Sequence, residues 1–461
     1  MASGGRQYDI VVFGASSFTG QFIVEELARV AGEERIKWAI AGRNMEKLQE
    51  VLKKATDNLA KDYNNIPIVI ADALNEESLN VMCKQTKLVL NVCGPFAHLG
   101  ENVVRACIEN KTHYVDVSGE VIFLENMQLK YNSMAKENKV YVVGSCGFRC
   151  LPVEMGVMFT SQKFDGDLNS LEAYLSTSGP VKYNTSTFES QVYGFQTRHE
   201  LKPLRKALFS SVEYYKPQHV VKAKSGLFYD KNSSKYCSSW PDAYKSVLYR
   251  SQRFLYENNQ IRPIQCALYV CHDSLLIIII FLITGFIMNF LANFSWGRAL
   301  LLKYPGFFSG GLAQSGGPTE SQINNSAFSV NFYGKGYPSR TKESEPHEDQ
   351  PDKAITTRVL GPDPGYLTTA ICVVQAALVV LKENEKIPDQ GGVLSPAAAF
   401  RNTGLVNRLT KRNLKFEIVD GEKAEDTTAP DCPSIEKTTA GATSLKSKTS
   451  VTPKYKLDIT G

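Results

Sequence analysis

The sequence lacks any arrangement of cysteines that would hold a metal ion or stabilise a secreted domain. None of its ten cysteines belongs to a C-x-x-C pair, and no group of cysteine and histidine has the spacing of zinc ligands. Several cysteines stand inside apolar runs, as Cys93 and Cys372 do, where the residue behaves as a small buried hydrophobe. We therefore expect no metal site, and a protein that is kept in a reducing compartment.

The chain also has little excess charge and no leader-like N-terminus. Its 52 Lys and Arg against 47 Asp and Glu give a formal net charge of +5 over 461 residues, which is no electrostatic footprint for nucleic acid. The opening MASGGRQ is followed at once by the strand-like YDIVVFG, which leaves no room for a signal or transit peptide. The sequence therefore favours a protein on the cytosolic side without a nucleic-acid partner.

A regular alternation of short apolar runs and helical stretches fills residues 1–150. The runs are β-branched and apolar without a period of two, which is typical of parallel strands buried on both faces. We expect these strands at 8–14, 37–42, 66–71, 88–93, 113–118 and 140–145, with helices between them. The order predicts an α/β fold in which residues 1–150 form a doubly wound, dinucleotide-binding Rossmann domain.

The turn after the first predicted strand has the pattern of a phosphate-binding loop. It reads GASSFTG, and such a loop needs a tight turn, close approach of backbone amides to the pyrophosphate and a helix N-terminus. Glycines at its two ends suit the turn and a close contact between helix and strand. Ser17 stands where the usual pattern has its middle glycine. We assign cofactor binding here to Gly14, Ser16, Ser17, Phe18, Thr19 and Gly20.

The end of the second predicted strand favours NADP over NAD as the cofactor. Proteins that prefer NAD tend to carry a carboxylate about twenty residues past the loop, whereas this chain has Arg43 at the strand end. A guanidinium can bind the 2′-phosphate as a bidentate fork; the alternative is an exposed arginine that opens a helix. The ends of the third and fourth strands supply the remaining cofactor-binding candidates, Asp72, Asn91, Gly94 and Pro95.

Catalytic groups are harder to identify. No tyrosine is followed by a lysine four residues later, so the tyrosine–lysine pair of short-chain dehydrogenases is not expected. The candidates follow the carboxyl ends of the later strands, where open α/β sheets bind ligands: His98, Ser118, Glu120, Arg149 and Cys150. Each also has a structural interpretation, as a surface loop residue, a helix-start carboxylate or an inert thiol, so the catalytic residues stay open.

Residues 151–420 predict a second α/β domain, and 421–461 a disordered tail rich in Thr, Ser, Lys and Pro. Within the second domain we expect a strand at 168–179, an antiparallel strand with one covered face at 326–337 and a buried helix at 366–384. The charged, apolar-poor stretch 340–354 indicates a disordered surface loop.

One long apolar run, LLIIIIFLITGFIMNFLANF at 275–294, has the length of a transmembrane helix. A span would place the residues before it and those after it on opposite sides of the membrane. The second domain needs both sets of residues on the same side. We favour attachment to a membrane without crossing over a span, and a span over a buried core helix. Gly285 and Asn289 would permit a bend within the run.

Longer motifs also occur in fixed order, among them GASSFTGQFIVEEL, AGRNMEKL, GENVVRACIENKTHYVDVSGE, GSCGF, GPDPGY and GGVLSPAAAF. In these the chain resembles the saccharopine dehydrogenase-like oxidoreductases, from residue 8 to residue 418. The resemblance implies a Rossmann domain, a second α/β domain, a nicotinamide cofactor and membership of the lipid-droplet proteome. It does not imply true saccharopine dehydrogenase activity. Relatives usually carry G-F-D-S-x-P where this chain has GFRCLP, so the base Arg149 replaces an acid.

These observations predict an NADP-dependent oxidoreductase attached to lipid droplets, or to the cytosolic face of a membrane, through 275–294. Its substrate would be a lipid-derived or other apolar carbonyl or enoyl compound. The alternative is a catalytically inactive nucleotide-binding scaffold or sensor of the lipid droplet. The substrate, the direction of hydride transfer, the proton donor and the oligomeric state stay open.

Overall fold

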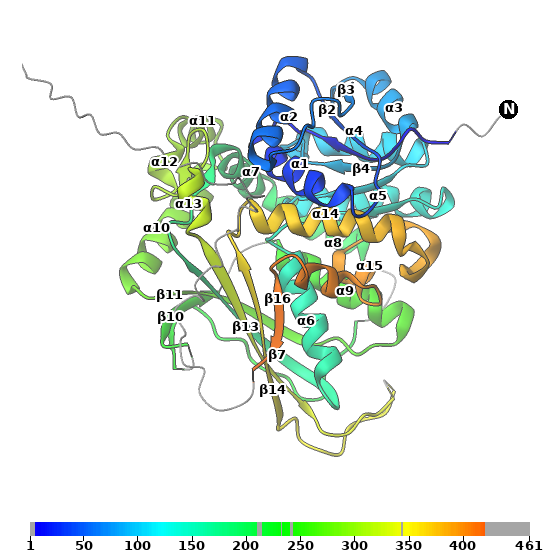
Figure 1. Cartoon of the computed structure of the whole chain (residues 1–461). Helices are drawn as coiled ribbons and strands as arrows, with labels where there is room; N and C mark the ends of the chain where they lie inside the picture. Colours follow the sequence, from blue (N-terminus) through cyan, green and yellow to red (C-terminus); the bar gives the residue numbers. More distant parts are fainter. Residues whose placement is uncertain (1–4, 210–213, 232, 240–242, 343, 420–461) are drawn as a thin grey trace, which may run out of the picture.

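Two seven-stranded sheets organise the chain, one above the other in Figure 1. The structure, a computed structural model, describes residues 5–419 except 210–213, 232, 240–242 and 343. The predicted α/β class, with a parallel Rossmann-type sheet followed by a second domain, is confirmed. The tail predicted to be disordered lies outside the described residues.

The first sheet is parallel throughout, in the order β15-β6-β5-β4-β1-β2-β3. Its strands are β1 (Tyr8–Phe13), β2 (Trp38–Gly42), β3 (Ile68–Ile70), β4 (Thr86–Asn91), β5 (His113–Asp116), β6 (Tyr141–Val143) and β15 (Gly392–Leu394). The helices between them are α1 (Phe18–Ala31), α2 (Met45–Leu59), α3 (Glu76–Gln85), α4 (Phe96–Glu109) and α5 (Val121–Glu137). Strands and helices are thus where the alternation predicts them. The strand order reverses between β1 and β4, which is where such sheets bind dinucleotides.

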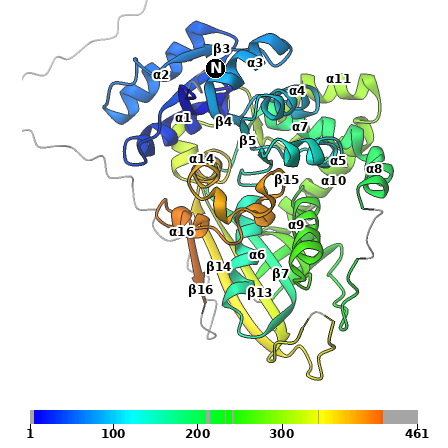
Figure 2. The same ribbon diagram turned by 90° about the vertical axis from the view of Figure 1, so that its right-hand side faces the viewer.

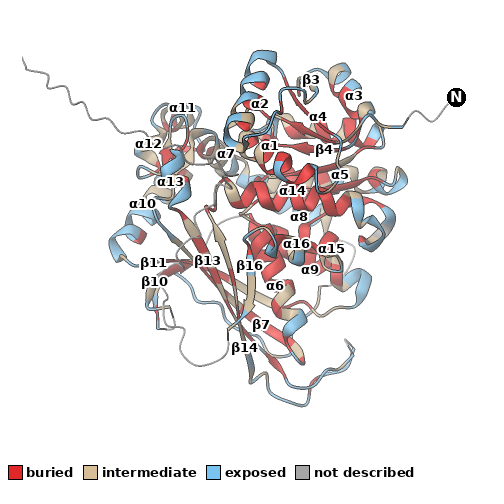
Figure 3. Ribbon diagram, viewed as in Figure 1, coloured by how far each residue is buried: buried red, intermediate tan, exposed pale blue. Residues whose placement is uncertain are grey.

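The chain returns to this sheet after building the second one. Helix α14 (Leu367–Lys382) packs against α1 and β4, and its residues are almost all buried, as Figure 3 shows in red. This confirms the buried helix expected at 366–384. Strand β15 then pairs with β6, so a segment assigned to the second domain adds a strand to the first sheet. The boundaries at 150 and 420 stay a prediction.

The second sheet is mixed, in the order β16-β14-β13-β7-β11-β10-β9. Its strands are β7 (Asp167–Ser178), β9 (Leu227–Asp230), β10 (Lys235–Ser239), β11 (Gln265–His272), β13 (Ala327–Tyr337), β14 (Lys353–Pro362) and β16 (Lys415–Ile418). β7 and β13 confirm the two predicted strands, and β13 alternates buried and half-buried residues over most of its length. Helices α6 (Leu151–Lys163) and α9 (Tyr244–Asn259) share a core with this sheet. The short α15 (Pro396–Phe400), α16 (Leu405–Thr410), η2 (Asn384–Lys386) and η3 (Pro388–Gln390) connect the last strands.

A third group of elements lies beside both sheets, at the upper left of Figure 1. It contains β8 (Tyr183–Asn184), α7 (Thr185–Gln196), α10 (Leu275–Leu291), α11 (Ser295–Lys303), α12 (Pro305–Phe308), β12 (Ala313–Gln314) and α13 (Glu320–Asn324). From α7 the chain continues through η1 (Thr197–Glu200) and α8 (Leu201–Leu208), which pack against α5 of the first domain. Figure 2, turned by 90°, shows α7 beside α4 and α11. α7 therefore connects this group to the first domain.

Helix α10 covers most of the apolar run, but only Ile278, Met288 and Leu291 of its 17 residues are buried. The buried core helix considered from the sequence is therefore wrong. Among the helices of the described chain, none has the length and apolarity needed to cross a membrane. The run ends because the chain folds back: a Cβ at Gly297 would lie 2.2 Å from the Leu291 carbonyl oxygen, so only glycine allows α11 to begin so close to α10.

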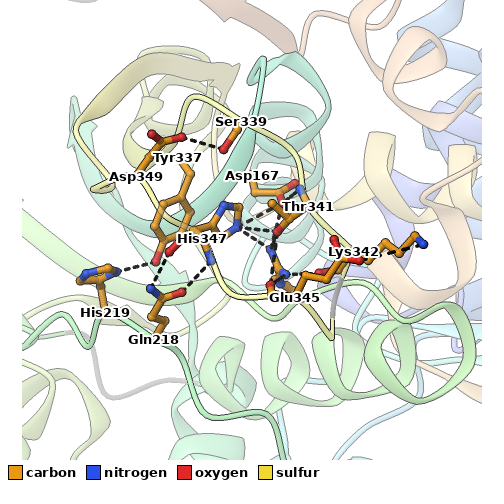
Figure 4. Close-up of polar contacts among 11 residues, drawn as sticks. Asp167, Gln218, His219, Tyr337, Ser339, Thr341, Lys342, Glu345, His347 and Asp349 are labelled. Carbon is orange, nitrogen blue, oxygen red and sulfur yellow. Dashed lines mark hydrogen bonds and ion pairs between the residues drawn. The ribbon is translucent and has the colours of Figure 1, made fainter.

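The charged stretch 340–354 differs from the predicted disordered loop over its described residues. His347 is buried and stacks on Tyr337, with ring centroids 3.7 Å apart (Figure 4). The Arg262 guanidinium donates to the Asp167 carboxylate at 3.0 Å and to the Thr341 hydroxyl at 2.8 Å. The prediction was wrong because one buried aromatic pair and one arginine, which composition does not weigh, hold the loop against the second sheet.

Candidate functional site

The turn after β1 sits at the point where the strand order reverses. Gly14 has φ +85°, and a Cβ there would lie 2.7 Å from the backbone nitrogen of Cys93, beyond the end of β4. Only glycine tolerates both the conformation and the contact. The loop therefore lies directly against the end of β4, at the carboxyl edge of the sheet.

The first turn of α1 follows within the same loop. A Cβ at Gly20 would lie 2.5 Å from the Gly14 carbonyl oxygen, so glycine lets the helix begin close to the strand. Ser17 is the N-cap, and its hydroxyl oxygen accepts the Gly20 amide at 3.0 Å. Among the described residues, the amides of Ser16, Phe18 and Thr19 have no intramolecular acceptor. Free amides at a helix N-terminus are donors for a phosphate group.

Arg43 extends from the neighbouring strand end. The carbonyl of Ala41, the fourth residue of β2, accepts the Gly14 amide at 2.9 Å, which holds the loop beside β2. The Arg43 side chain is exposed. Burial raises the pKa of the Cys93 thiol, the positive charge of Arg43 lowers it and the negative charge of Asp72 raises it. Arg43 and Asp72 are thus within electrostatic range of the residue that contacts the loop.

Asn91, at the end of β4, is used to shape the neighbouring loop. Its side chain is fully buried, accepts the Cys93 amide at 2.9 Å and donates to the Tyr114 hydroxyl at 3.0 Å. Gly94 and Pro95 follow, joined by a cis peptide bond. The assignment of these residues to cofactor binding stays a prediction. The side chain of Asn91 is used to support the loop.

A buried carboxylate that the sequence analysis did not select continues this network. The Tyr114 hydroxyl donates to Asp116 at 2.9 Å, and the amides of Ser118 and Ser145 donate to the other carboxylate oxygen at 2.9 and 2.8 Å. Burial raises the pKa of Asp116 to about 6, against these hydrogen bonds. Asp116 therefore fixes the loops after β5 and β6. An acid at the end of an apolar strand, in HYVDVS, was the available signal.

The catalytic candidates do not form one constellation. Glu120 accepts the amides of Phe96 and Ala97 at 3.0 and 2.6 Å, and burial raises its pKa. His98 is exposed, and its ring meets the Tyr193 ring edge-on, with the ring centroids 4.8 Å apart. The structure thus brings Glu120 and His98 to the same end of α4.

The other candidates lie on the loops after β5 and β6. The Ser118 hydroxyl accepts the Glu120 amide at 3.2 Å. Cys150 is the N-cap residue of α6 and is 1% exposed, in the core. The Arg149 side chain runs over Gly119, where a Cβ would lie 3.0 Å from its Cδ, and its charge lowers the otherwise raised pKa of Tyr183.

The second domain closes on the phosphate loop through an aromatic contact that sequence reasoning missed. The Phe18 ring meets Tyr366 edge-on, with centroids 4.8 Å apart, and fills the space beside Gly317, where a Cβ would lie 2.4 Å from it. The Tyr366 hydroxyl accepts the Asn184 amide at 2.7 Å. Tyr366 ends GPDPGY, whose spacing gave no indication of its partner. Phe18 therefore joins the loop to the second domain.

The residues around Gly14 fit a dinucleotide: a glycine without room for a side chain, open helix-start amides and an exposed guanidinium at the neighbouring strand end. Within the described ranges, no three His, Cys, Asp or Glu side chains are grouped so as to hold a metal ion.

Comparison with known proteins agrees with this geometry. Residues 10–143 match a family model described as the saccharopine dehydrogenase NADP binding domain. This match confirms NADP as the cofactor predicted for the domain.

Curated relatives cover almost the whole chain, among them the following two. The human saccharopine dehydrogenase-like oxidoreductase is 38% identical over 92% of this chain and 100% of its own. A Caenorhabditis elegans protein named lipid droplet localized protein is 32% identical over 89% of this chain and 98% of its own. Among solved structures, apo saccharopine dehydrogenase (L-Glu forming) from Saccharomyces cerevisiae matches with a TM-score of 0.51 at 12% identity. It covers 89% of this chain and 100% of that one, and so shows a shared fold.

Proposed function

Because the chain belongs to the saccharopine dehydrogenase-like oxidoreductase family, we propose that it is an NADP-dependent oxidoreductase that works on a lipid surface. Its substrate is a lipid-derived or other apolar carbonyl or enoyl compound. The surface is that of a lipid droplet or the cytosolic face of a membrane.

The single observation that carries the cofactor part is the contact of Gly14 with the end of β4 beside an exposed Arg43. The pyrophosphate lies over the loop, where the amides of Ser16, Phe18 and Thr19 donate to it. The guanidinium of Arg43 binds the 2′-phosphate. When bound, the cofactor supplies or accepts a hydride at its nicotinamide ring.

Binding measurements with NADPH and NADH test this assignment. Arg43→Ala should raise the Kd for NADPH about tenfold or more and that for NADH less than about twofold, because a charge-assisted hydrogen bond to the 2′-phosphate is lost. Lys53→Ala, an exposed cation on α2, is the matched control and should change neither Kd. Equal Kd values for the two cofactors in the unmodified protein, unchanged in Arg43→Ala, would contradict the assignment.

The lipid part rests on the exposed apolar side chains of α10, α11 and α12, which we call the lipid-facing helices. Phe286 is 73% exposed and Phe307 80%. The other exposed apolar residues of these helices and their connections are Leu275, Leu276, Ile277, Ile279, Ile280, Phe281, Leu282, Ile283, Ile287, Phe290, Phe294, Trp296 and Tyr304. Because α10, α11 and α12 pack against one another, these side chains stand on neighbouring helices, and an exposed apolar surface of this kind marks an interaction site. Figure 3 shows α10 largely in pale blue beside the red core strands.

The composition of this surface favours a lipid occupant. Between 275 and 308 the charged residues are Arg298 and Lys303, both basic, which suits anionic headgroups. Trp296 and Tyr304 provide the amphipathic rings typical of a membrane interface. The name of the C. elegans relative supports the same occupant.

Flotation with lipid vesicles or triglyceride emulsions tests the surface. Replacing Phe286 and Phe307 together by Glu should abolish flotation, because two charges would enter the apolar phase. Leu74→Glu, at a site 70% exposed on the first domain, is the matched control and should float like the unmodified protein. Unchanged flotation of the double variant would contradict the lipid assignment.

A specific observation favours the alternative of a nucleotide-binding scaffold. Both oxygens of the Glu120 carboxylate accept backbone amides, and the Cys150 thiol is buried in the core, so neither is presented as an acid, base or nucleophile. Incubation with NADPH and a lipid extract, followed by absorbance, separates the two. Consumption of NADPH supports the enzyme, and binding without consumption supports the scaffold.

A further inference from the structure

Helix α7 has two faces that serve different parts of the molecule. Phe188 and Val192 are fully buried against the lipid-facing helices, in a cluster with Met288, Leu291, Ala292, Leu301 and Ala313. Figures 1 and 2 both show α7 between this group and the first domain.

The opposite face of α7 contacts the candidate site. Since a helix turns about 100° per residue, Ser190 and Tyr193 point away from Phe188 and Val192. The Ser190 side chain is close enough to the Glu120 carboxylate to lower its pKa by hydrogen bonding, and the ring of Tyr193 meets that of His98 with the centroids 4.8 Å apart. A single helix therefore separates the exposed apolar surface from the residues around the start of α4.

From Glu120 the contacts continue to the phosphate loop. The carboxylate holds the amides of Phe96 and Ala97, which fixes the start of α4 directly after Pro95. The backbone just before, at Cys93, is the group against which Gly14 packs. The series consists of direct contacts and of the backbone between Cys93 and Phe96, so α7 and the phosphate loop belong to one packed network.

We propose that α7 couples lipid binding to cofactor binding, so that attachment of the lipid-facing helices to a surface tightens the hold on NADPH. This inference rests on the proposed function, which supplies both ligands. A lipid surface binds the exposed side chains only in the arrangement that presents them together, and it stabilises that arrangement. α7 is stabilised with it, and Ser190 then keeps Glu120 on the amides that shape the loop next to Gly14. By reciprocity, NADPH strengthens lipid binding by the same factor.

The test measures the Kd for NADPH with and without vesicles of phosphatidylcholine and phosphatidylserine, and flotation on the same vesicles separately. We expect vesicles to lower the Kd about fivefold or more in the unmodified protein. Ser190→Ala should float equally well and change its Kd less than about twofold with vesicles, because the hydrogen bond to Glu120 is missing. Ser186→Ala is the matched control on the same helix. It makes the same residue change at an exposed position, and the Ser186 amide, not its hydroxyl, donates to the Asn184 side chain.

Hydrogen exchange of the α7 amides supplies a second measurement, and it should slow on vesicles in the unmodified protein. A Kd that vesicles leave unchanged, in protein that floats, overturns the coupling and leaves the proposed function intact. A full response in Ser190→Ala overturns the route through Glu120. If the unmodified protein does not float or does not bind NADPH, the proposed function itself is contradicted, and the coupling that rests on it is contradicted too.

Discussion

The carboxylate of Glu120 accepts the backbone amide of Ala97 at 2.6 Å and so caps a helix that is not its own. Pro95, the N-cap residue of α4, has no side chain that could accept the first amides of the helix, and Glu120 takes that place from the loop after β5. Its negative charge also lies at the positive end of the α4 dipole. The residue that the sequence marks as a possible acid thus has a structural task between two loops of the candidate site.

Glu120→Ala should destabilise the protein by about 1–2 kcal/mol, the usual cost of losing an N-cap acceptor. It should also weaken NADPH binding, because the loop before α4 loses its anchor. Thermal or urea unfolding measures the first effect and cofactor titration the second. Glu120→Gln keeps one acceptor oxygen, so its stability and its affinity for NADPH should lie between those of Glu120→Ala and those of the unmodified protein. A Glu120→Ala protein with unchanged stability and lost turnover would show instead that the carboxylate acts on the substrate.

Gly14→Ala should abolish measurable NADPH binding and lower stability by more than about 1 kcal/mol. The added Cβ meets the Cys93 nitrogen at 2.7 Å in a backbone conformation with φ +85°, so the loop must move away from β4. Gly5→Ala, where a Cβ has nothing within 4 Å, is a glycine control that should change neither quantity. Wild-type affinity in Gly14→Ala would mean that the dinucleotide lies elsewhere.

The first domain could be predicted because each of its signals is local. The strand YDIVVFG runs directly into the loop GASSFTG, and the arginine stands at the end of the next strand, WAIAG. A parallel sheet brings consecutive strand ends to one edge. The same holds for β13, whose alternating burial matches the period-two pattern of its residues. NADP followed from Arg43 on the same grounds.

What could not be predicted depends on contacts between distant segments. The Phe18 ring packs on Tyr366 and against Gly317, far along the chain, and no spacing rule connects them. The return of β15 to pair with β6 is of the same kind. His347 looked like part of a solvated charged loop because composition does not show that Tyr337 lies beneath it.

Ser17→Ala should lower the free energy of unfolding by about 1 kcal/mol, because the hydroxyl that accepts the Gly20 amide is lost. Ser17→Gly should lower the free energy of unfolding by only a few tenths of a kcal/mol, since glycine is tolerated at an N-cap. The neighbour Ser16→Ala should do the reverse: stability is kept, and NADPH binding weakens because the variant keeps the amide but loses the Ser16 hydroxyl as a second donor to the phosphate. Urea unfolding combined with cofactor titration distinguishes the two serines. If Ser17→Ala lost affinity without losing stability, Ser17 would be a phosphate ligand rather than a cap.

The pH dependence of stability should depend on Glu154, which lies in the core at the start of α6. One of its oxygens accepts the Ser251 hydroxyl at 2.6 Å and the Ala397 amide at 2.8 Å, while the other is buried without a partner in the described part of the chain. Burial raises the pKa of Glu154 to about 7, from 4.5. Between these values the folded protein keeps a proton that the unfolded chain has lost, so stability is full below pH about 4.5 and falls as the pH rises through about 7.

Glu154→Gln removes this titration and leaves the shape of the side chain nearly unchanged. The difference in unfolding free energy between the variant and the unmodified protein should therefore move in favour of the variant as the pH rises from about 5 to about 8, by up to about 3 kcal/mol. The amide adds N–H groups near the unpartnered position, but their cost is the same at every pH and does not enter the slope. Urea unfolding of both proteins across this range measures the change. A difference that stays constant with pH would mean that Glu154 ionises as easily in the folded protein as in the unfolded chain, and that water or a movement of α6 relieves its burial.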